Sequence, residues 1–270
     1  MKYRYFLELS YKGKNYSGWQ IQPHHQTVQQ TLQDAFKMLV KSDVEIVGAG
    51  RTDTGVHASY YVAHLDIDVL FENTDQLIYK VNCILPKDIV LFSLILVSME
   101  FHARFSAIRR CYKYQICLKK NAFYHDYAWY LYKKLDLDMM QKAADILLQT
   151  DDFTSFCKIS KDQPGHLCKV DKADWHKSGD LLIFTIEANR FLRNMVRAIV
   201  GTLVKVGEQA MSIEDFKLII EKKNRSEAGI SVPSQGLFLS NIHYPEHINK
   251  LLPYRNNLAD IPTIHVSNMF

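Results

Sequence analysis

Residues 48–57 read Gly-Ala-Gly-Arg-Thr-Asp-Thr-Gly-Val-His and lie between two stretches of regular, apolar sequence. A helical pattern of apolar residues over 28–40 precedes them, and a strand-like run over 60–68 follows. A polar segment that is punctuated by glycine between two such elements predicts a loop, and loops commonly carry function. Functional residues are therefore expected in this loop.

Asp53 is the only carboxylate in the loop, and Arg51 and His57 lie close to it in sequence. An aspartate that is held in a turn and kept ionised by a cation can act as a nucleophile or a general base. The simpler interpretation is an Asx-turn, in which the carboxylate bonds its own backbone. The triplet at 53–55 also matches the Asp-Thr-Gly of aspartic proteases. Those enzymes need two such carboxylates sharing a proton. This sequence has no second copy of the triplet and contains several helical patterns, which disfavours that chemistry.

Composition predicts a folded cytoplasmic protein. The chain has 270 residues, of which 47% are hydrophobic and 23% charged, enough for one large or two small domains and too apolar for disorder. Its five cysteines form no C-x-x-C pair, so neither a disulfide framework nor a zinc site is indicated. The start of the chain lacks the apolar core of a signal peptide. No apolar run approaches the roughly 20 residues that span a bilayer, so no membrane association is expected.

The net charge of +4 is too small to identify a polyanionic partner, but its distribution is uneven. Residues 101–120 contain six basic residues and no acidic one, namely Arg104, Arg109, Arg110, Lys113, Lys119 and Lys120. Such a segment is compatible with a phosphate-binding surface and equally with a solvated surface strand.

The first part of the chain predicts alternating strands and helices. Strands are expected at 3–11, 60–68 and 89–97, with helices at 28–40 and 75–83 between them. Thr27 is the expected N-cap of the first helix. Trp19 lies in a mixed aromatic and polar loop, where it could either cover the edge of the core or stack on a base. This order predicts an α+β half-molecule.

The second part repeats this alternation. A strand at 112–117 would place Tyr112, Tyr114 and Ile116 on one face. The remaining expected elements are helices that begin after Asp136, at Phe191 and after Ser212, a hairpin of 170–176 with 180–188, and a last strand at 235–244. We expect an N-terminal half at 1–103, a C-terminal half at 104–246 and a tail at 247–270. The fold class is α+β, with two similar halves, each a mostly antiparallel sheet with helices on one face, joined around a central cleft.

The helix expected from Phe191 to Val206 would carry three arginines on one face. Arg190, Arg193 and Arg197 have the spacing i, i+3 and i+7. They could be surface residues whose stems cover apolar neighbours. They could instead line a cleft that attracts negative charge, and the sequence leaves both interpretations open.

Residues 50–58 resemble the G-R-T-D-x-G-V-H-A signature of the TruA-like tRNA pseudouridine synthases. Further stretches are similar to motifs of this family in the same order, at 11–13, 16–23, 27–29, 101–107, 112–114, 152–156, 191–201, 228–229 and 236–239. Asp151 stands where the family often has His, and Phe238 where Tyr is common. The resemblance extends from about residue 3 to residue 244.

This resemblance implies an isomerase that converts uridine to pseudouridine at positions 38, 39 and 40 in the anticodon stem-loop of tRNA, with no cofactor and no metal. It implies that Asp53 is the nucleophile, that Tyr112 stacks on the target base and assists the proton on C5, and that Arg197 pairs with Asp53. Attack at C1′, attack at C6 and removal of a ribose proton all remain open for Asp53. The residues expected to bind the substrate are Arg51, Thr52, His57, Arg104, Arg109 and Arg110, together with Tyr112.

The family resemblance also implies a homodimer, with one tRNA lying across both subunits. A non-enzymatic alternative is an RNA-binding or RNA-chaperone protein of the same fold. The joint presence of Asp53, Tyr112 and Arg197 argues against that alternative, because a protein that only binds RNA has no need of this set.

Overall fold

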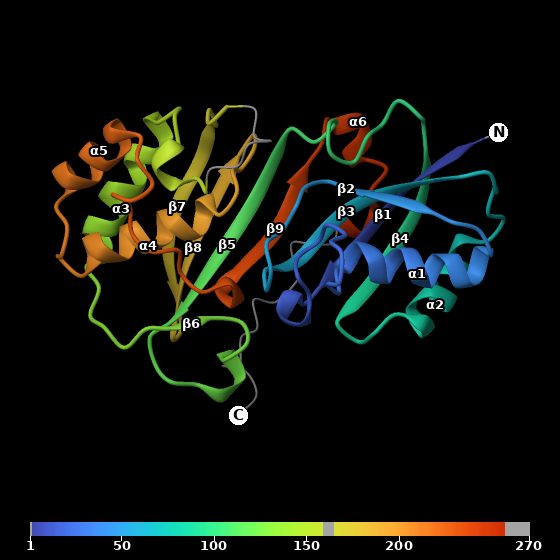
Figure 1. Cartoon of the computed structure of the whole chain (residues 1–270), viewed down its shortest axis with the longest axis horizontal. Coiled ribbons are helices and arrows are strands. Elements are labelled where there is room, and N and C mark those ends of the chain that lie inside the picture. Colours follow the sequence, from blue (N-terminus) through green and yellow to red (C-terminus); the bar gives the residue numbers. More distant parts are fainter. Residues whose placement is uncertain (1, 159–164, 257–270) are drawn as a thin grey trace. The chain divides into compact units, whose positions relative to one another are not determined.

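The computed structural model describes residues 2–158 and 165–256 and shows an α+β protein with mostly antiparallel strands (Figure 1). This confirms the predicted α+β class with mostly antiparallel strands. The chain forms two compact units. Unit 1 contains the described residues of Met1–Ile108 and Leu239–Phe270, and unit 2 contains those of Arg109–Phe238. Unit 1 is therefore built from both ends of the described chain.

The sheet of unit 1 has the strand order β4-β1-β3-β9, with β2 paired to β3. The strands span Ile89–Val97 (β4), Tyr3–Tyr11 (β1), His57–Ile67 (β3), Leu237–His243 (β9) and Glu45–Gly48 (β2). In β1, Leu7 lies opposite Ala63 on one side and Leu94 on the other. The middle of β1 is buried on both faces.

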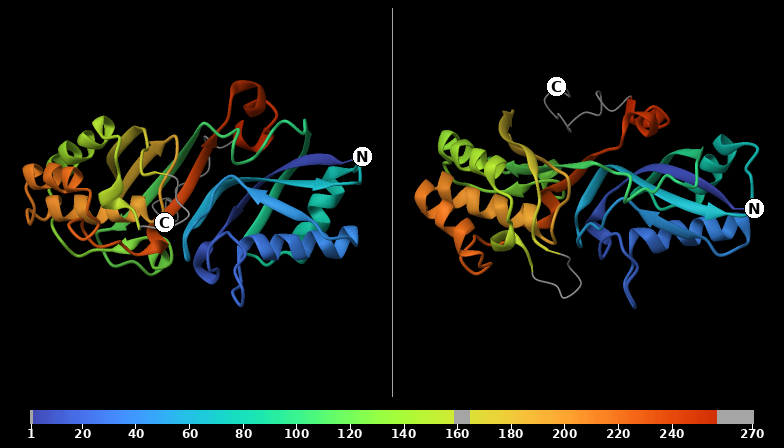
Figure 2. Two further views of the ribbon diagram at one scale, coloured as in Figure 1. Left: turned by 45° about the horizontal axis from the view of Figure 1, so that its top comes forward. Right: turned by 90° about the horizontal axis from the view of Figure 1, so that it is seen from above.

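Helix α1, Val28–Val40, turns Val28, Leu32 and Phe36 inward. The Thr27 hydroxyl accepts a hydrogen bond from the N–H of Gln30, as expected of its N-cap. Helix α2, Thr74–Ile84, packs against β4. Figure 2 shows α1 and the short helix α6, Glu246–Asn249, on opposite faces of this sheet. In unit 1, the expectation of helices on one face only is therefore wrong.

Glu8 connects β1 to the end of the described chain. Its side chain is fully buried, and its carboxylate accepts hydrogen bonds from the hydroxyls of Tyr60 (2.8 Å) and Ser93 (2.6 Å). It also accepts bonds from the backbone N–H groups of Tyr254 (3.0 Å) and Arg255 (2.9 Å), which belong to α7, Pro253–Asn256. Four donors satisfy a carboxylate that would otherwise be costly to bury.

The sequence beyond Tyr244 lacks periodicity, and an irregular tail was expected there. The structure instead shows α6 and α7 in this region, both too short for periodicity to reveal. Residues 257–270 lie outside the described part of the chain.

Unit 2 is built on strands β5, β8 and β7 in that order. They span Arg109–Cys117 (β5), Leu181–Ala188 (β8) and Val170–Ser178 (β7), and the short strand β6, Trp129–Tyr130, pairs parallel with β5. Strands β7 and β8 form the predicted hairpin, whose turn contains Gly179 at a φ of 57°. Helices α3, Leu137–Ile146, and α5, Ile213–Lys222, begin after Asp136 and Ser212 as predicted, and both side chains cap their helices.

Helix α4, Met195–Gly207, starts four residues later than its apolar spacing predicts. Asn194 adopts the left-handed backbone conformation with a φ of 65°, which ends any helical path from Phe191. Arg190 and Arg193 therefore precede the helix, and Arg197 alone of the three lies on it. The predicted helical stripe of three arginines is wrong.

Candidate functional site

Asp53 lies in a tight turn between β2 and β3 and is half-buried. The backbone N–H of Val56 donates to the carbonyl oxygen of Asp53 at 3.1 Å and closes the turn. Gly55 has a φ of 77°, a conformation that favours glycine. Because a backbone carbonyl closes the turn, the carboxylate of Asp53 is not needed to hold it.

Two aromatic residues, Trp19 and Tyr61, pack against the Asp53 loop. The Trp19 ring stacks on Tyr61 with centroids 4.2 Å apart, and the Tyr61 hydroxyl donates to the carbonyl of Gly50. The backbone N–H of Trp19 donates to the backbone carbonyl of Thr52 at 3.2 Å. Gly48 allows this approach, since a Cβ there would lie 2.5 Å from the Trp19 ring. Trp19 is 1% exposed, so it belongs to the core, and the base-stacking interpretation is wrong for this conformation.

Two loop side chains point into unit 1 and anchor the loop. The Thr52 hydroxyl is hydrogen-bonded to the Tyr11 hydroxyl at 2.9 Å, and the Nδ1 atom of His57 accepts from the N–H of Gly13 at 3.0 Å. Both side chains are buried. A Cβ at Gly13 would lie 1.9 Å from the carbonyl oxygen of Val56. The turn that follows β1 therefore packs directly against the end of the Asp53 loop.

Tyr112 lies on β5 in unit 2, directly opposite Ile186 of β8. Its side chain is buried, and its ring meets Phe191 edge to face with centroids 4.9 Å apart. Tyr114 is buried on the same face, as the alternation predicts, and its hydroxyl donates to the carbonyl of Pro233 at 2.8 Å. Burial raises the pKa of the Tyr114 phenol far above its usual value, so this neighbour remains a neutral donor.

Arg197 stands in the first turn of α4 and is half-buried. Its Nε donates to the carbonyl of Val232 at 2.6 Å, and the Val232 N–H donates back to the Arg197 carbonyl at 3.3 Å. Gly201 permits this contact, because a Cβ there would lie 1.9 Å from the carbonyl oxygen of Ile230. The extended segment after α5 thus fixes the direction of the arginine side chain.

The basic stretch that begins at residue 101 has acidic neighbours in space. Arg109 forms an ion pair with Asp171 of β7 at 3.2 Å, and Lys119 pairs with Asp180 at 3.2 Å. Arg110 donates to the carbonyl of Asn189 at 3.1 Å. The sequence window lacks acids, but the neighbouring hairpin supplies them.

The structure groups the predicted site residues by unit. Asp53, Arg51, Thr52, His57 and Arg104 belong to unit 1, and Arg51 and Arg104 are exposed. The remaining four, Tyr112, Arg197, Arg109 and Arg110, belong to unit 2.

Sequence reasoning missed the residues that support the loop. Gly13 and Tyr11 lie far from Asp53 in sequence, and no local pattern connects them to it. The pair Tyr60-Tyr61 does carry a signal, because consecutive strand residues face opposite sides of a sheet. Tyr60 reaches Glu8, and Tyr61 reaches the loop.

The described residues contain neither a metal-binding cluster nor a membrane-spanning helix. Over residues 2–158 and 165–256, no cluster of three or more His, Cys, Asp or Glu side chains is arranged to hold a metal ion. None of the helices in this part of the chain is long and apolar enough to cross a membrane.

Comparison with known proteins identifies the class. The family profile described as tRNA pseudouridine synthase matches residues 143–245. Pseudouridine synthases are isomerases that convert uridine to pseudouridine.

Similarity to individual proteins extends over nearly the whole chain. The tRNA pseudouridine synthase A of Parabacteroides distasonis is 46% identical over 245 residues, which cover 91% of this chain and 97% of that protein. The protein of the same name from Bacteroides fragilis is 45% identical over 91% of this chain and 98% of its own length. The one from Thermoanaerobacter sp. is 40% identical over 88% of this chain and 98% of its own. The chain therefore belongs to the tRNA pseudouridine synthase A family.

Proposed function

We propose that this protein isomerises uridine to pseudouridine in the anticodon stem-loop of tRNA, at positions 38, 39 and 40. The bond between C1′ and N1 breaks, the uracil turns, and a bond forms between C1′ and C5. The proton on C5 is lost and N1 gains one. The reaction needs no cofactor or metal. The enzyme acts in the cytoplasm as a homodimer, with one tRNA across both subunits.

The observation that carries this proposal is the support of the Asp53 loop. Separate contacts from Trp19, Tyr61 and Gly13 hold a loop that contains a single carboxylate. A catalytic group held in one geometry does not have to be ordered during the reaction, which is a main source of rate enhancement. Asp53 is the nucleophile. The target base is stacked within the stem-loop and must first be flipped out, at a cost of a few kcal/mol.

Tyr112 and Arg197 complete the site in a cleft between two similar halves. Tyr112 stacks on the target base and assists the proton on C5. Arg197 pairs with Asp53 and keeps its carboxylate ionised and oriented. The Nε of Arg197 is already bonded to Val232. A bidentate pair with Asp53 would therefore use the two terminal nitrogens of the guanidinium, in an end-on geometry.

The remaining site residues divide into two groups. The arginines at positions 51, 104, 109 and 110 contact the phosphates of the RNA. Thr52 and His57 serve the substrate indirectly, because both are buried and hold the loop through Tyr11 and Gly13.

The test is to incubate the protein with unmodified tRNA transcripts. Pseudouridine is then mapped by chemical adduct formation and reverse-transcriptase stops. Three transcripts, each with uridine at only one of positions 38, 39 and 40, establish which positions react. We expect stops at these positions with the wild-type protein and none with Asp53→Asn. Asp53→Asn should bind tRNA with nearly unchanged affinity, since phosphate contacts supply most of it.

Asp68→Asn is a matched control, because Asp68 is an exposed aspartate after the end of β3. It should leave activity intact. Turnover by Asp53→Asn would remove Asp53 from its proposed role. Tight tRNA binding by the wild-type protein without any pseudouridine would favour the RNA-binding alternative instead.

A further inference from the structure

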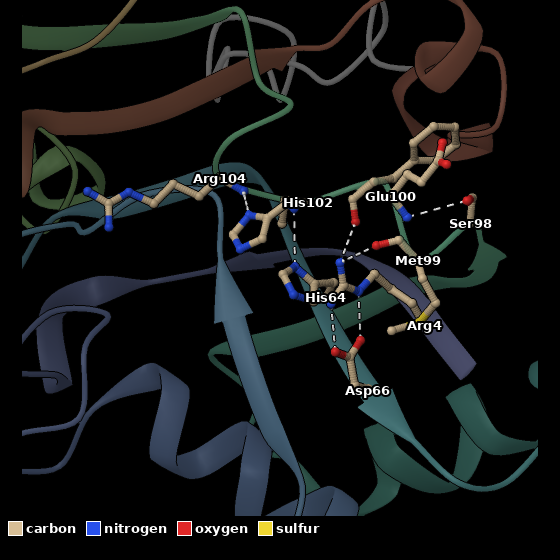
Figure 3. A network of polar contacts seen from close by, with 10 residues as sticks. Arg4, His64, Asp66, Ser98, Met99, Glu100, His102 and Arg104 are labelled. Carbon is tan, nitrogen blue, oxygen red and sulfur yellow. Dashed lines mark hydrogen bonds and ion pairs between the residues drawn. The ribbon is translucent and has the colours of Figure 1, made fainter. Parts of the chain in front are cut away.

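The guanidinium of Arg4 holds the segment that follows β4, residues 98–106. Arg4 of β1 donates from Nε and Nη2 to the two carboxylate oxygens of Asp66, at 2.7 and 2.6 Å. Its Nη1 donates to the carbonyls of Met99 and Phe101, both at 2.9 Å (Figure 3). The hydrogen bond from Arg4 lowers the pKa of Asp66, so the pair is ionised at neutral pH. One side chain thus ties β1, β3 and the segment together.

Two histidines fix the next residues. The N–H of Ala103 donates to Nδ1 of His64 at 3.1 Å. The N–H groups of Arg104 and Phe105 donate to Nδ1 of His102 at 3.1 and 3.2 Å. Burial lowers the pKa of His64 to about 4 and also lowers that of His102. Both rings are therefore neutral at physiological pH, the state in which a ring nitrogen can accept.

Three further hydrogen bonds hold the backbone of residues 102–106. The Tyr244 hydroxyl donates to the carbonyl of Ala103 at 2.6 Å, and the His102 N–H donates to the hydroxyl of Ser106 at 2.9 Å. The Ser106 N–H donates back to the carbonyl of His102 at 2.9 Å. The backbone around residues 102–106 is therefore determined by contacts on several sides.

This rigid backbone presents an apolar ring to solvent. The Phe105 side chain is 76% exposed and contributes little to the core. The Arg104 guanidinium carbon lies 5.5 Å from the centre of that ring. Figure 3 shows the Arg104 side chain extending away from the Arg4–Asp66 pair. An exposed aromatic ring on a rigid loop beside a cation resembles a binding platform that has been ordered before its ligand arrives.

We propose that Phe105 stacks on an unpaired nucleobase of the RNA substrate, with Arg104 on the adjacent phosphate. This proposal rests on the proposed function. Proteins that read single-stranded RNA stack its splayed bases on aromatic side chains and arginine planes. The cation beside the ring favours RNA over a second copy of this chain, because each nucleotide brings an anionic phosphate next to its base.

The test measures tRNA affinity in the Asp53→Asn background, where no substrate is consumed. Phe105→Ala should weaken binding by about 5- to 150-fold, the range for loss of one stacked base. Phe105→Trp should bind as the parent does, and Phe105→Leu should bind like Phe105→Ala. Phe123→Ala is the matched control, since Phe123 is 70% exposed and lies in unit 2. It should change nothing.

The salt dependence of tRNA affinity distinguishes the stacking by Phe105 from the phosphate contact by Arg104. Phe105→Ala should leave the slope of log affinity against log salt unchanged, because stacking releases no counterions. Arg104→Gln should make that slope shallower by about one unit. Circular dichroism and thermal melting confirm that each variant is folded.

Unchanged affinity in Phe105→Ala, or equal affinity in Phe105→Leu and the parent, would overturn the stacking role. A Phe105→Ala variant with a changed sedimentation mass would assign the ring to an interface between copies. The proposed function fails separately, if the wild-type protein forms no pseudouridine on any of the three transcripts.

Discussion

The Nδ1 atom of His57 accepts a hydrogen bond from the backbone N–H of Gly13 at 3.0 Å. This bond joins the turn after β1 to the residue that ends the Asp53 loop. The position of the carboxylate therefore depends on a glycine 40 residues earlier in the chain.

Gly13→Ala should reduce the rate of pseudouridine formation by about 10²-fold, the effect of displacing a catalytic group by about 1 Å. A Cβ at Gly13 would lie 1.9 Å from the carbonyl oxygen of Val56 and force the loop to move. Gly50→Ala is the control for stability, because a Cβ there meets no atom within 4 Å. Single-turnover rates and thermal melts measure both effects. A Gly13→Ala enzyme with the wild-type rate would show that the loop adjusts without cost.

Tyr112→Phe separates the hydroxyl of this residue from its ring. If the hydroxyl assists proton transfer, turnover should fall by about 10²- to 10⁴-fold with little loss of binding. If the ring acts only by stacking, Tyr112→Phe should be nearly silent and Tyr112→Ala severe. Phe191, which packs against the ring, should hold the phenyl group in place in Tyr112→Phe. Single-turnover kinetics with saturating enzyme measure the step directly, and mild, equal effects from both variants would contradict either role.

Arg197→Met should lose activity and also melt at a lower temperature. Loss of one partner from a buried ion pair costs about 3–5 kcal/mol, and for the proposed pair with Asp53 we expect the lower end because Arg197 is half-buried. Arg197→Lys keeps the charge but lacks the planar guanidinium that can donate two parallel hydrogen bonds. It should therefore recover only part of the activity.

Arg193→Met provides the control for Arg197, because this neighbouring arginine is exposed and precedes α4. It should leave the melting temperature unchanged. A crystal structure with the Arg197 guanidinium directed into solvent, beyond reach of Asp53, would contradict the pairing.

Unit 1 should lose stability in mild acid, because the buried ring of His64 is neutral in the folded state and resists protonation. Burial lowers its pKa to about 4 in the folded state, against about 6.5 in an unfolded chain. The unfolded state therefore binds the extra proton first as the pH falls. The stabilisation is complete above pH 6.5 and is lost as the pH falls toward 4, by at most about 3 kcal/mol.

Urea unfolding at several pH values between 4.5 and 7.5 measures this loss. His64→Asn offers an amide oxygen to the N–H of Ala103 and does not titrate, so its stability should vary less with pH. His125→Asn, which replaces an exposed ring in unit 2, should retain the wild-type dependence. Identical pH profiles for His64→Asn and the wild-type protein would exclude His64 as the cause.

The elements that the sequence predicted well are those whose signals are local. Thr27, Asp136 and Ser212 each accept a hydrogen bond from a backbone N–H three residues later, within the helix that they begin. The alternation that places Tyr112 and Tyr114 on one face is likewise a property of a single strand.

The errors came from features that periodicity does not record. Phe191 and Leu192 continue the apolar spacing of α4, but the left-handed backbone of Asn194 interrupts the helix before they can join it. Arg109 and Lys119 lack acidic neighbours in sequence, but their partners come from the hairpin of β7 and β8.

Only part of the candidate site could be predicted from the sequence. The glycines and the lone carboxylate indicated the Asp53 loop from sequence alone. Its support by Gly13, Trp19 and Tyr61 depends on the register of β1 and β3, which is set by the whole sheet and is invisible in any local window.

The bonds between Glu8 and α7 have a consequence for the order in which the protein is completed during synthesis. Glu8 is translated before unit 2, but two of its four donors, the N–H groups of Tyr254 and Arg255, are translated only after all of unit 2. A nascent chain therefore lacks half of the donors to this carboxylate until unit 2 has been made. Unit 2, which is continuous in sequence, is free to fold first, and unit 1 closes around its first strand afterwards.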